Sequence, residues 1–173
     1  ALFFSMPGFC TGYIKDIYTS MPYMSACEAE LDKPMPVQSM HLPLVSVVAV
    51  ALIDRDGRIL LGKRPAHKAM AGLWEFPGGK IEDGEIPEYA LMRECYEELG
   101  IETRPGCFMP LTFASHSYDD FHLLMPVYAC RTWRGTPKAH VHERLKWVRA
   151  CDMQAYPMPE ADWPLCTRVC AHV

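Results

Sequence analysis

The pattern of apolar and polar residues becomes regular only from residue 42 onward. Residues 44–53 (LVSVVAVALI) are almost wholly apolar, residues 54–57 (DRDG) have the composition of a turn, and residues 58–64 (RILLGKR) form a second apolar run. Apolar β-branched runs separated by Asp and Gly are typical of two strands joined by a turn. The pattern therefore predicts a β-hairpin over residues 44–64.

The remaining pattern predicts further strands and two helices. Pro87 suits the first turn of a helix and Gly100 suits its end, so a helix is expected over residues 87–99. Asp119 and Asp120 mark a turn between two long apolar segments, which are expected to pair as strands. The other expected elements are a loop at 65–72, a short strand at 73–76 closed by PGG at 77–79, a strand at 144–150 and a terminal helix from Trp163. Strands dominate and helices are few, which indicates an α+β protein.

Residues 1–41 keep neither a strand period nor a helix period and are rich in Met, Pro, Ser and Tyr. We expect an N-terminal extension over 1–41, either a flexible tail or residues translated ahead of a start near Met40, and a folded domain over 42–173. The segment has no Arg and no cationic start before an apolar stretch, so neither a mitochondrial presequence nor a secretory signal is expected.

Charge and composition narrow the function. The formal net charge of −4 over 173 residues argues against binding nucleic acid through a basic surface, so a polyphosphate ligand would need a metal ion. No apolar run reaches the roughly 18 residues of a membrane span, and a cytoplasmic protein is expected. The eight cysteines contain no CxxC pair and are expected to be buried free thiols; a metal site at Cys166, Cys170 and His172 is the weaker alternative.

The predicted helix carries three acidic residues on one face. At about 100° per residue, Glu94, Glu97 and Glu98 lie within an arc of about 100°, beside an apolar face that includes Leu91, Cys95, Leu99, Met92 and Tyr96. Like charges at this spacing repel, and a solvated acidic face is the ordinary explanation of such a run. Here the face follows a Gly-Gly turn and further acids, and oxygen ligands of this kind are what Mg²⁺ or Mn²⁺ prefers. A divalent cation would offset the repulsion.

These residues resemble the signature box of the Nudix hydrolases. The matching positions are Gly79, Glu85 and the run RECYEELGI at 93–101, with Cys95 where the family usually has an aliphatic residue. Segments before and after the box resemble the MutT-type branch, which hydrolyses nucleoside triphosphates, and the resemblance covers residues 42–170. It implies an α/β/α sandwich with a mixed β-sheet flanked by helices, and release of a nucleoside monophosphate and pyrophosphate.

The resemblance also implies roles for individual residues. Mg²⁺, or Mn²⁺ as a substitute, would be held by Glu94, Glu97, Glu98 and the carbonyl of Gly78, with Glu94 as the best candidate for the general base within the box. Glu143 matches an acid outside the box that serves as a ligand or base, although a surface acid is an equal expectation. Gly79, Glu85 and Arg93 would give structural support, with Glu85 and Arg93 paired. Candidate substrate contacts are Arg64 and Lys80 for phosphate, and Phe76, Asp120, Phe121 and Asp162 for the base. We expect His140 and His142 to be surface histidines.

Three functions stay open at this point. The leading hypothesis is a Mg²⁺-dependent nucleoside triphosphate pyrophosphohydrolase that cleans the nucleotide pool, with 8-oxo-dGTP as a candidate substrate. The enzymatic alternative is the same chemistry on CTP, a dinucleotide or ADP-ribose. The third is a non-catalytic base-recognition module. The expected partner is a small nucleotide, with no direct nucleic-acid binding and no membrane; the oligomeric state is left open.

Overall fold

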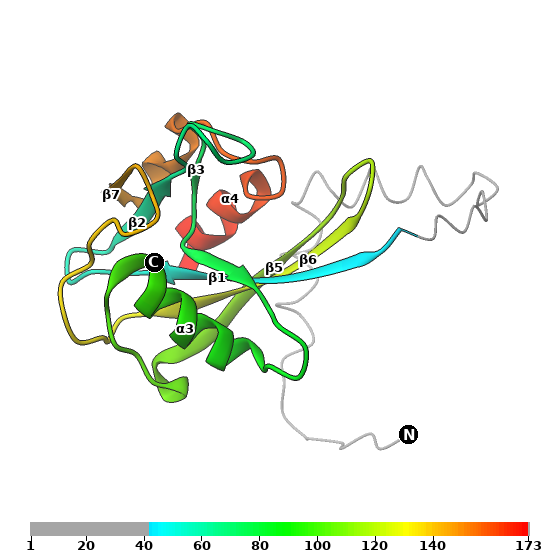
Figure 1. Cartoon of the computed structure of the whole chain (residues 1–173). Coiled ribbons are helices and arrows are strands. Elements are labelled where there is room, and N and C mark those ends of the chain that lie inside the picture. Colours follow the sequence, from blue (N-terminus) through cyan, green and yellow to red (C-terminus); the bar gives the residue numbers. More distant parts are fainter. Residues whose placement is uncertain (1–41, 173) are drawn as a thin grey trace, which may run out of the picture. The chain divides into compact units, whose positions relative to one another are not determined.

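The computed structural model describes residues 42–172 of the chain (Figure 1). The predicted N-terminal extension lies outside these residues. The described elements, in chain order, are β1 (Leu44–Leu52), β2 (Arg58–Lys63), β3 (Trp74–Glu75), β4 (Gly78–Lys80), α3 (Pro87–Leu99), η1 (Pro105–Cys107), β5 (Phe108–Ser117), β6 (His122–Cys130), β7 (Arg144–Arg149), η2 (Ala150–Ala155) and α4 (Trp163–His172). None of the helices described is long and apolar enough to cross a membrane.

Strand β1 lies at the centre of the fold because both of its faces are apolar. Successive side chains of a strand point to opposite faces. Val48, Val50 and Leu52 pack in one core with Leu91 and Cys95 of α3. The intervening residues Ala49 and Ala51 pack in a second core with Leu165 and Val169 of α4. Figure 1 shows the two helices on opposite sides of β1. The predicted α+β sandwich is thereby confirmed.

The strands form two sheets, and this corrects the predicted hairpin. One sheet has the order β4-β1-β6-β5, in which β1 and β6 are parallel and the other pairs antiparallel; the other has the order β3-β2-β7. The turn at 54–57 does connect β1 to β2, through a bridge between Ile53 and Ile59. Beyond that bridge, β1 pairs with β4 and β6 while β2 pairs with β3 and β7. The predicted pairing was wrong because both strands find longer partners far away in the sequence.

Several sequence predictions agree with the structure. The strand pair around residues 119–120 is the antiparallel β5–β6 pair, and the strand at 144–150 is β7. Helix α3 has the predicted bounds, begins with Pro87 and ends at Gly100, which takes the left-handed conformation (φ 65°) that caps helices. Tyr96 is an exception on its apolar face, because its side chain is 64% exposed. The short segment 77–79, expected only to close a strand, is largely part of β4 and pairs with β1.

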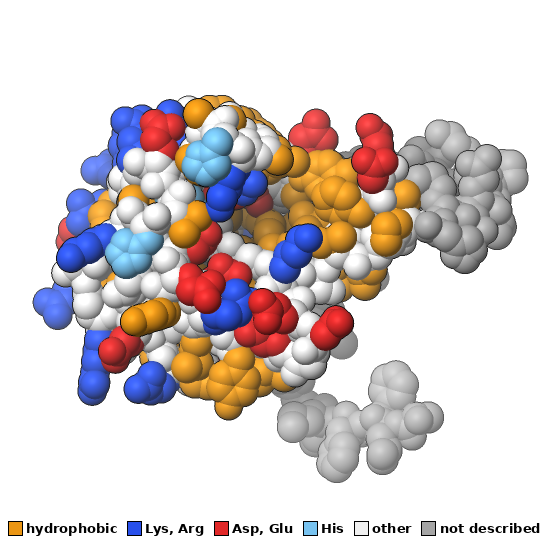
Figure 2. Space-filling model, in the orientation of Figure 1, with side chains coloured by type: hydrophobic (Ala, Val, Ile, Leu, Met, Phe, Trp, Pro, Cys, Tyr) orange, Lys and Arg blue, Asp and Glu red, His pale blue; other side chains and the backbone are white. Residues whose placement is uncertain are grey.

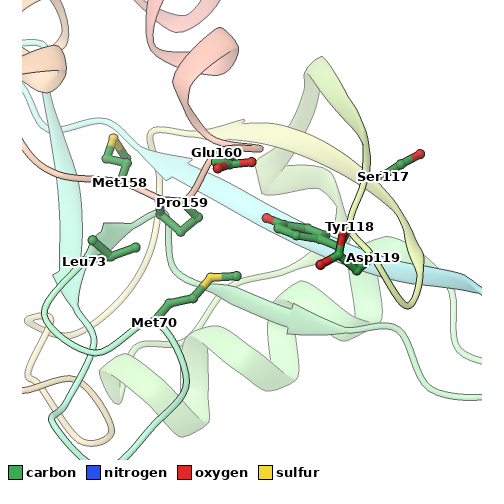
Figure 3. Close-up of a pocket in the computed structure, with 8 residues that line it drawn as sticks. All are labelled: Met70, Leu73, Ser117, Tyr118, Asp119, Met158, Pro159 and Glu160. Carbon is green, nitrogen blue, oxygen red and sulfur yellow. The ribbon is translucent and has the colours of Figure 1, made fainter.

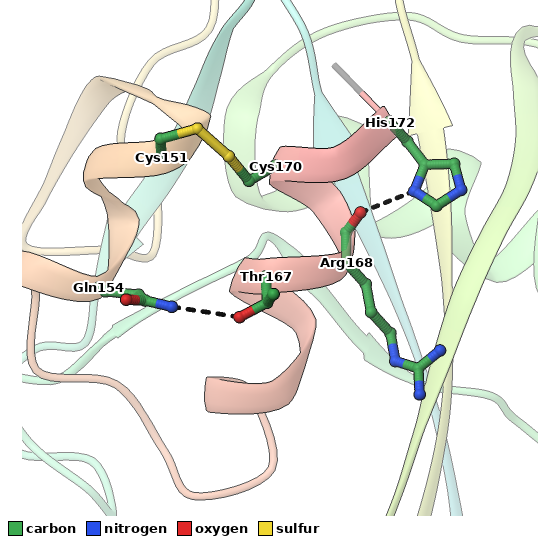
Figure 4. The surroundings of a disulfide bond; sticks show 6 residues. All are labelled: Cys151, Gln154, Thr167, Arg168, Cys170 and His172. Atoms are coloured by element: carbon green, nitrogen blue, oxygen red, sulfur yellow. Dashed lines mark hydrogen bonds between the residues drawn. A yellow bond between two sulfur atoms is a disulfide. The ribbon is translucent and has the colours of Figure 1, made fainter. Parts of the chain in front are cut away.

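The cysteines depart from the expectation of free thiols. Cys95, Cys130 and Cys166 are buried and free, and Cys107 is free and half-buried. Cys151 of η2 and Cys170 of α4 form a disulfide, beside a hydrogen bond from Gln154 Nε2 to Thr167 Oγ1 (3.1 Å; Figure 4). This excludes the alternative metal site at Cys166, Cys170 and His172, because the thiol of Cys170 is already used. Cys10 and Cys27 lie outside the described residues.

Candidate active site

The three box glutamates lie on the face of α3 that borders β4. Their side chains differ in exposure, because Glu97 is 55% exposed whereas Glu94 and Glu98 are 13% and 12% exposed. Figure 2 shows acidic side chains gathered around a basic one on the face where Figure 1 places α3 and β4. The three residues that the sequence singled out therefore lie on one helix, with Glu94 and Glu98 largely covered and Glu97 open to solvent.

The two glycines of β4 allow this close approach. The backbone N–H of Gly78 donates a hydrogen bond to Glu98 Oε2 (3.2 Å). The carboxylate of Glu94 fills the space that a Cβ atom at Gly79 would occupy, so any larger residue there would collide with it. The glycine turn thus forms a cradle for two of the three carboxylates.

Arg93 braces the loop before the helix, as predicted. Its Nε and Nη2 atoms donate to the two carboxylate oxygens of Glu85 (3.2 and 2.9 Å), and Nη2 also donates to the carbonyl of Lys80 (3.0 Å). This two-point contact lowers the pKa of Glu85 and raises that of Arg93. Arg93 Nη1 also contacts Glu94 (2.6 Å) and Glu97 (3.6 Å), so it offsets part of the repulsion within the box.

Glu98 is the most perturbed acid of the box. Burial raises its pKa to about 7, and the charges of Glu94 and Glu75 act in the same direction. His142 and the N–H of Gly78 act in the opposite direction. His142 is itself 6% exposed and lies between Glu75 and Glu98, so the prediction of a surface histidine was wrong at this position. His140 is exposed, as predicted.

The box residues fit a hard divalent cation. Carboxylate oxygens are the donors that Mg²⁺ and Mn²⁺ prefer, and the Gly79 cradle holds one carboxylate against the backbone. Among residues 42–172, no three Asp, Glu, His or Cys side chains are already gathered as a cation site. Arg93 holds Glu94 and contacts Glu97, and a cation at the box would compete with this guanidinium for the same oxygens.

A cavity of about 330 Å³ opens beside the box. Its lining includes the glycines of β4, Arg64 and Lys80, and also Phe76, Phe121 and Asp162. Five of the six predicted substrate contacts therefore share one cavity. Asp120 does not line it, because its side chain is exposed at the turn between β5 and β6. Its role in base recognition stays a prediction.

Arg64 is held in place by the cavity wall. Its Nη1 donates to Glu75 Oε2 (2.5 Å) and its Nε donates to the carbonyl of Ala69 (2.7 Å). Glu75 was missed by the sequence reasoning. Its position between the buried side chains of Trp74 and Phe76 is the only signal that its carboxylate points the other way, toward the cavity.

Asp162 is a buried acid in the lining of the cavity. It is 4% exposed and precedes the first turn of α4. Burial raises its pKa to about 7, the charge of Glu75 raises it further, and Arg64 acts in the opposite direction. Asp162 can therefore carry a proton near neutral pH, and the protonated carboxyl both donates and accepts a hydrogen bond.

A second cavity of about 550 Å³ adjoins the first (Figure 3). The two cavities share Met70, Tyr118 and Pro159. Figure 3 shows that the lining comes from the loop before β3, the β5–β6 turn and the segment before α4. No box acid lines either cavity, but the smaller one is lined by Gly78 and Gly79, against which Glu98 and Glu94 lie, so it is the one next to the candidate cation site.

Glu143 lies outside the cavity. Its side chain is 46% exposed and pairs with Lys63 Nζ (2.9 Å). No contact joins it to the box glutamates among the described residues, and its role as a further ligand or base stays a prediction.

Comparison with known proteins agrees with this geometry. A family profile described as the NUDIX domain matches residues 48–168. The chain is 42% identical to a CTP pyrophosphohydrolase of Escherichia coli over 72% of this chain and 90% of that protein. It is 32% identical to an 8-oxo-dGTP diphosphatase of the same species over 70% of this chain and 94% of that protein. The solution structure of the E. coli ORF135 protein superposes with a TM-score of 0.67 at 36% identity, covering 75% of this chain and 91% of that one.

The α+β sandwich and the acidic helix packed against a Gly-Gly strand are the features of a hydrolase that cleaves phosphoanhydride bonds. The chain belongs to the Nudix family and is a nucleotide pyrophosphohydrolase of its MutT-like branch.

Proposed function

We propose that the protein hydrolyses a (deoxy)nucleoside triphosphate to the monophosphate and pyrophosphate, with CTP as the first candidate substrate and 8-oxo-dGTP as the second. The observation that carries this proposal is one cavity lined both by the β4 glycines, against which Glu94 and Glu98 lie, and by Phe76, Phe121 and Asp162. In this proposal the triphosphate binds beside the β4 glycines and the box, and the base binds near Phe76, Phe121 and Asp162.

The proposed reaction gives a role to the box acids and to the two basic residues of the cavity. Water adds to a phosphorus of the α–β anhydride, one P–O bond breaks and pyrophosphate leaves. A divalent cation bound by Glu94, Glu97 and Glu98 would supply charge neutralisation and water activation. Glu94 is the proposed acceptor of the proton of that water. Lys80 and Arg64 face the phosphates, and Arg64 does so from a position fixed by Glu75 and Ala69.

Asp162 supports cytosine as the preferred base. Cytosine presents an amino donor at N4, and Asp side chains accept from this group. A protonated carboxyl can in addition donate to the neighbouring ring nitrogen, so the raised pKa of Asp162 suits a base with a donor and an acceptor side by side. The identity to a CTP pyrophosphohydrolase points in the same direction. The 8-oxo-dGTP diphosphatase among the relatives keeps an oxidised purine as the second candidate.

A substrate panel tests the proposal. The protein is incubated with Mg²⁺ and CTP, dCTP, 8-oxo-dGTP, dGTP or ADP-ribose, and pyrophosphate and phosphate are measured separately. We expect pyrophosphate as the direct product and the highest kcat/KM for a cytosine nucleotide. Direct release of phosphate would contradict the assigned cleavage. Failure to hydrolyse any of the five compounds would favour a base-recognition module.

The Glu98→Gln variant tests the role of the box. Because it removes a carboxylate but keeps the shape, we expect kcat to fall by about 10²-fold or more while the protein stays folded. Glu102→Gln is the matched control, since Glu102 is exposed and follows the same helix outside the box. Equal activity of the two variants would show that the ligand assignment is wrong.

A further inference from the structure

His142 is the buried polar residue of the site that the chemistry above does not use. Its Nε2 atom lies 3.4 Å from Glu75 Oε1 and 3.9 Å from Glu98 Oε2. An ionised carboxylate accepts and cannot donate, so a hydrogen on Nε2 suits a position between two such groups. The imidazole therefore stands between the box and the wall of the cavity.

The backbone fixes this position from two sides. Before His142, the N–H groups of Lys138 and His140 donate to the carbonyls of Leu99 (2.9 Å) and Glu98 (3.0 Å), which are free at the end of α3. After His142, the N–H of Glu143 donates to the carbonyl of Lys63 at the end of β2 (2.8 Å). The residue is thereby tied to the helix of the box and to the second sheet at the same time.

The space for the ring is built into β2. The imidazole lies directly against Gly62, and a Cβ atom there would collide with ring carbon and nitrogen atoms. A glycine inside a strand weakens it, because no side chain packs there. Its presence opposite His142 indicates that the strand makes room for this ring.

Packing alone does not account for a histidine here. Its Nδ1 atom is buried and has no hydrogen-bond partner, and an unpaired buried polar group costs stability that an apolar side chain would not. Such an unsatisfied group in a native site calls for another reason. The pair of carboxylates near Nε2 supplies such a reason.

We propose that His142 is a positioning residue that holds Glu75 and Glu98 in a fixed relation. Hydrogen bonds join Arg64 to Glu75 and Gly78 to Glu98, and His142 Nε2 lies between these two acids at 3.4 and 3.9 Å. This network sets the cation-binding acids of α3 against the phosphate-facing arginine beside β2. The inference rests on the proposed function for its kinetic consequence, but the arrangement of the acids can be tested without substrate.

The test compares His142→Ala, His142→Gln and the control His140→Ala, which alters an exposed histidine of the same loop. Three quantities are measured: the Kd for Mn²⁺ from the signal of free Mn²⁺ in electron paramagnetic resonance, kcat and KM for CTP, and the midpoint of thermal unfolding. Loss of a residue that orients metal ligands typically lowers metal affinity or activity about 10- to 100-fold. We expect His142→Ala to weaken Mn²⁺ binding and kcat by about tenfold or more, with a smaller change in KM.

The conservative variant separates positioning from packing. The amide nitrogen of Gln reaches about as far as Nε2 and donates in the same way, so His142→Gln should recover part of both losses. Recovery by Gln would support the proposal. His142→Ala that matches His140→Ala in Kd and kcat would overturn it, as would a His142→Gln variant no better than His142→Ala.

A double-mutant cycle keeps the proposal testable if His142→Ala does not fold. Glu75→Gln is combined with His142→Gln, and Mn²⁺ affinity is measured for all four proteins. Residues in one network give non-additive effects, whereas independent residues add. Additive effects would overturn the proposal. If no nucleotide is hydrolysed by the wild type, the proposed function fails, while the Mn²⁺ measurements still decide the role of His142.

Discussion

Two buried carboxyls of the site, Glu98 and Asp162, have similarly raised pKa values in different settings. Glu98 receives the N–H of Gly78 and stands among other acids, as a cation site requires. Asp162 lies among apolar residues of the cavity lining, where burial and the charge of Glu75 raise its pKa and Arg64 favours its ionised form. Because their surroundings differ, the same residue type suits charge binding in one place and hydrogen bonding with a neutral base in the other.

Asp162 gives a prediction at the scale of one residue. Its pKa is about 7 in the folded protein and 3.8 when unperturbed, so between these values the folded state binds more protons than the unfolded state. The free energy of unfolding therefore falls as pH rises from about 4 to about 7. The Asp162→Asn variant should lack this contribution to the pH dependence. Its free energy of unfolding should exceed that of the wild type by up to about 4 kcal/mol at pH 8, at about 1.4 kcal/mol per pKa unit.

Chemical denaturation of the two proteins from pH 4 to pH 8 measures this difference. Asp120→Asn, at the exposed turn, is the control and should follow the wild type. Parallel curves for Asp162→Asn and the wild type would contradict the assignment of a raised pKa to Asp162.

At the scale of elements, α4 is held by packing and by a covalent bond. Leu165, Cys166 and Val169 bury its inner face, and the disulfide from Cys170 joins its last turn to Cys151 of η2. The helix follows Asp162 directly. The same tie that stabilises the helix therefore also steadies the segment that contributes Asp162 to the cavity lining.

Removal of this disulfide should lower the free energy of unfolding. The bond closes a loop of 19 residues, and crosslinks of this length typically contribute about 3 kcal/mol. Cys170→Ser should unfold at lower denaturant concentration than the oxidised wild type. A reducing agent should shift the wild type toward the variant and leave the variant unchanged. Equal stability of the oxidised and reduced wild type would show that the bond contributes nothing.

The sequence allowed prediction of elements better than of their pairing. Helix α3 followed from Pro87, Gly100 and the spacing of Leu91, Cys95 and Leu99, all of which are local signals. The parallel pairing of β1 with β6 could not be predicted, because it joins residues about 80 positions apart, such as Leu44 and His122, and no local residue encodes it. The box acids were also predicted from a local signal, because their spacing places them on one face of this helix. His142 was missed because its burial depends on Gly62 and on two strands distant in sequence.

At the scale of the whole molecule, the NUDIX family profile matches residues 48–168, which lie inside the part that the structure describes. We propose that this part is a complete catalytic domain. A protein that begins at His41 should keep kcat and KM for CTP within about twofold of the full chain and unfold at a similar temperature, because it contains the whole segment that matches the family profile. Steady-state kinetics and thermal unfolding of both proteins check this. A large loss of activity with unchanged unfolding would instead assign a role in catalysis to residues 1–40.

The walls of the cavity have a consequence for how this enzyme could change its preference. The acids proposed to act in hydrolysis lie on α3, against the glycines of β4, whereas Met70, Tyr118, Phe121 and Asp162 come from three connecting segments that share no residue with these elements. The residues proposed for hydrolysis and those proposed for substrate recognition thus lie in separate segments of the chain. We therefore expect that substitutions confined to these connecting segments can change substrate preference without altering the residues proposed for hydrolysis.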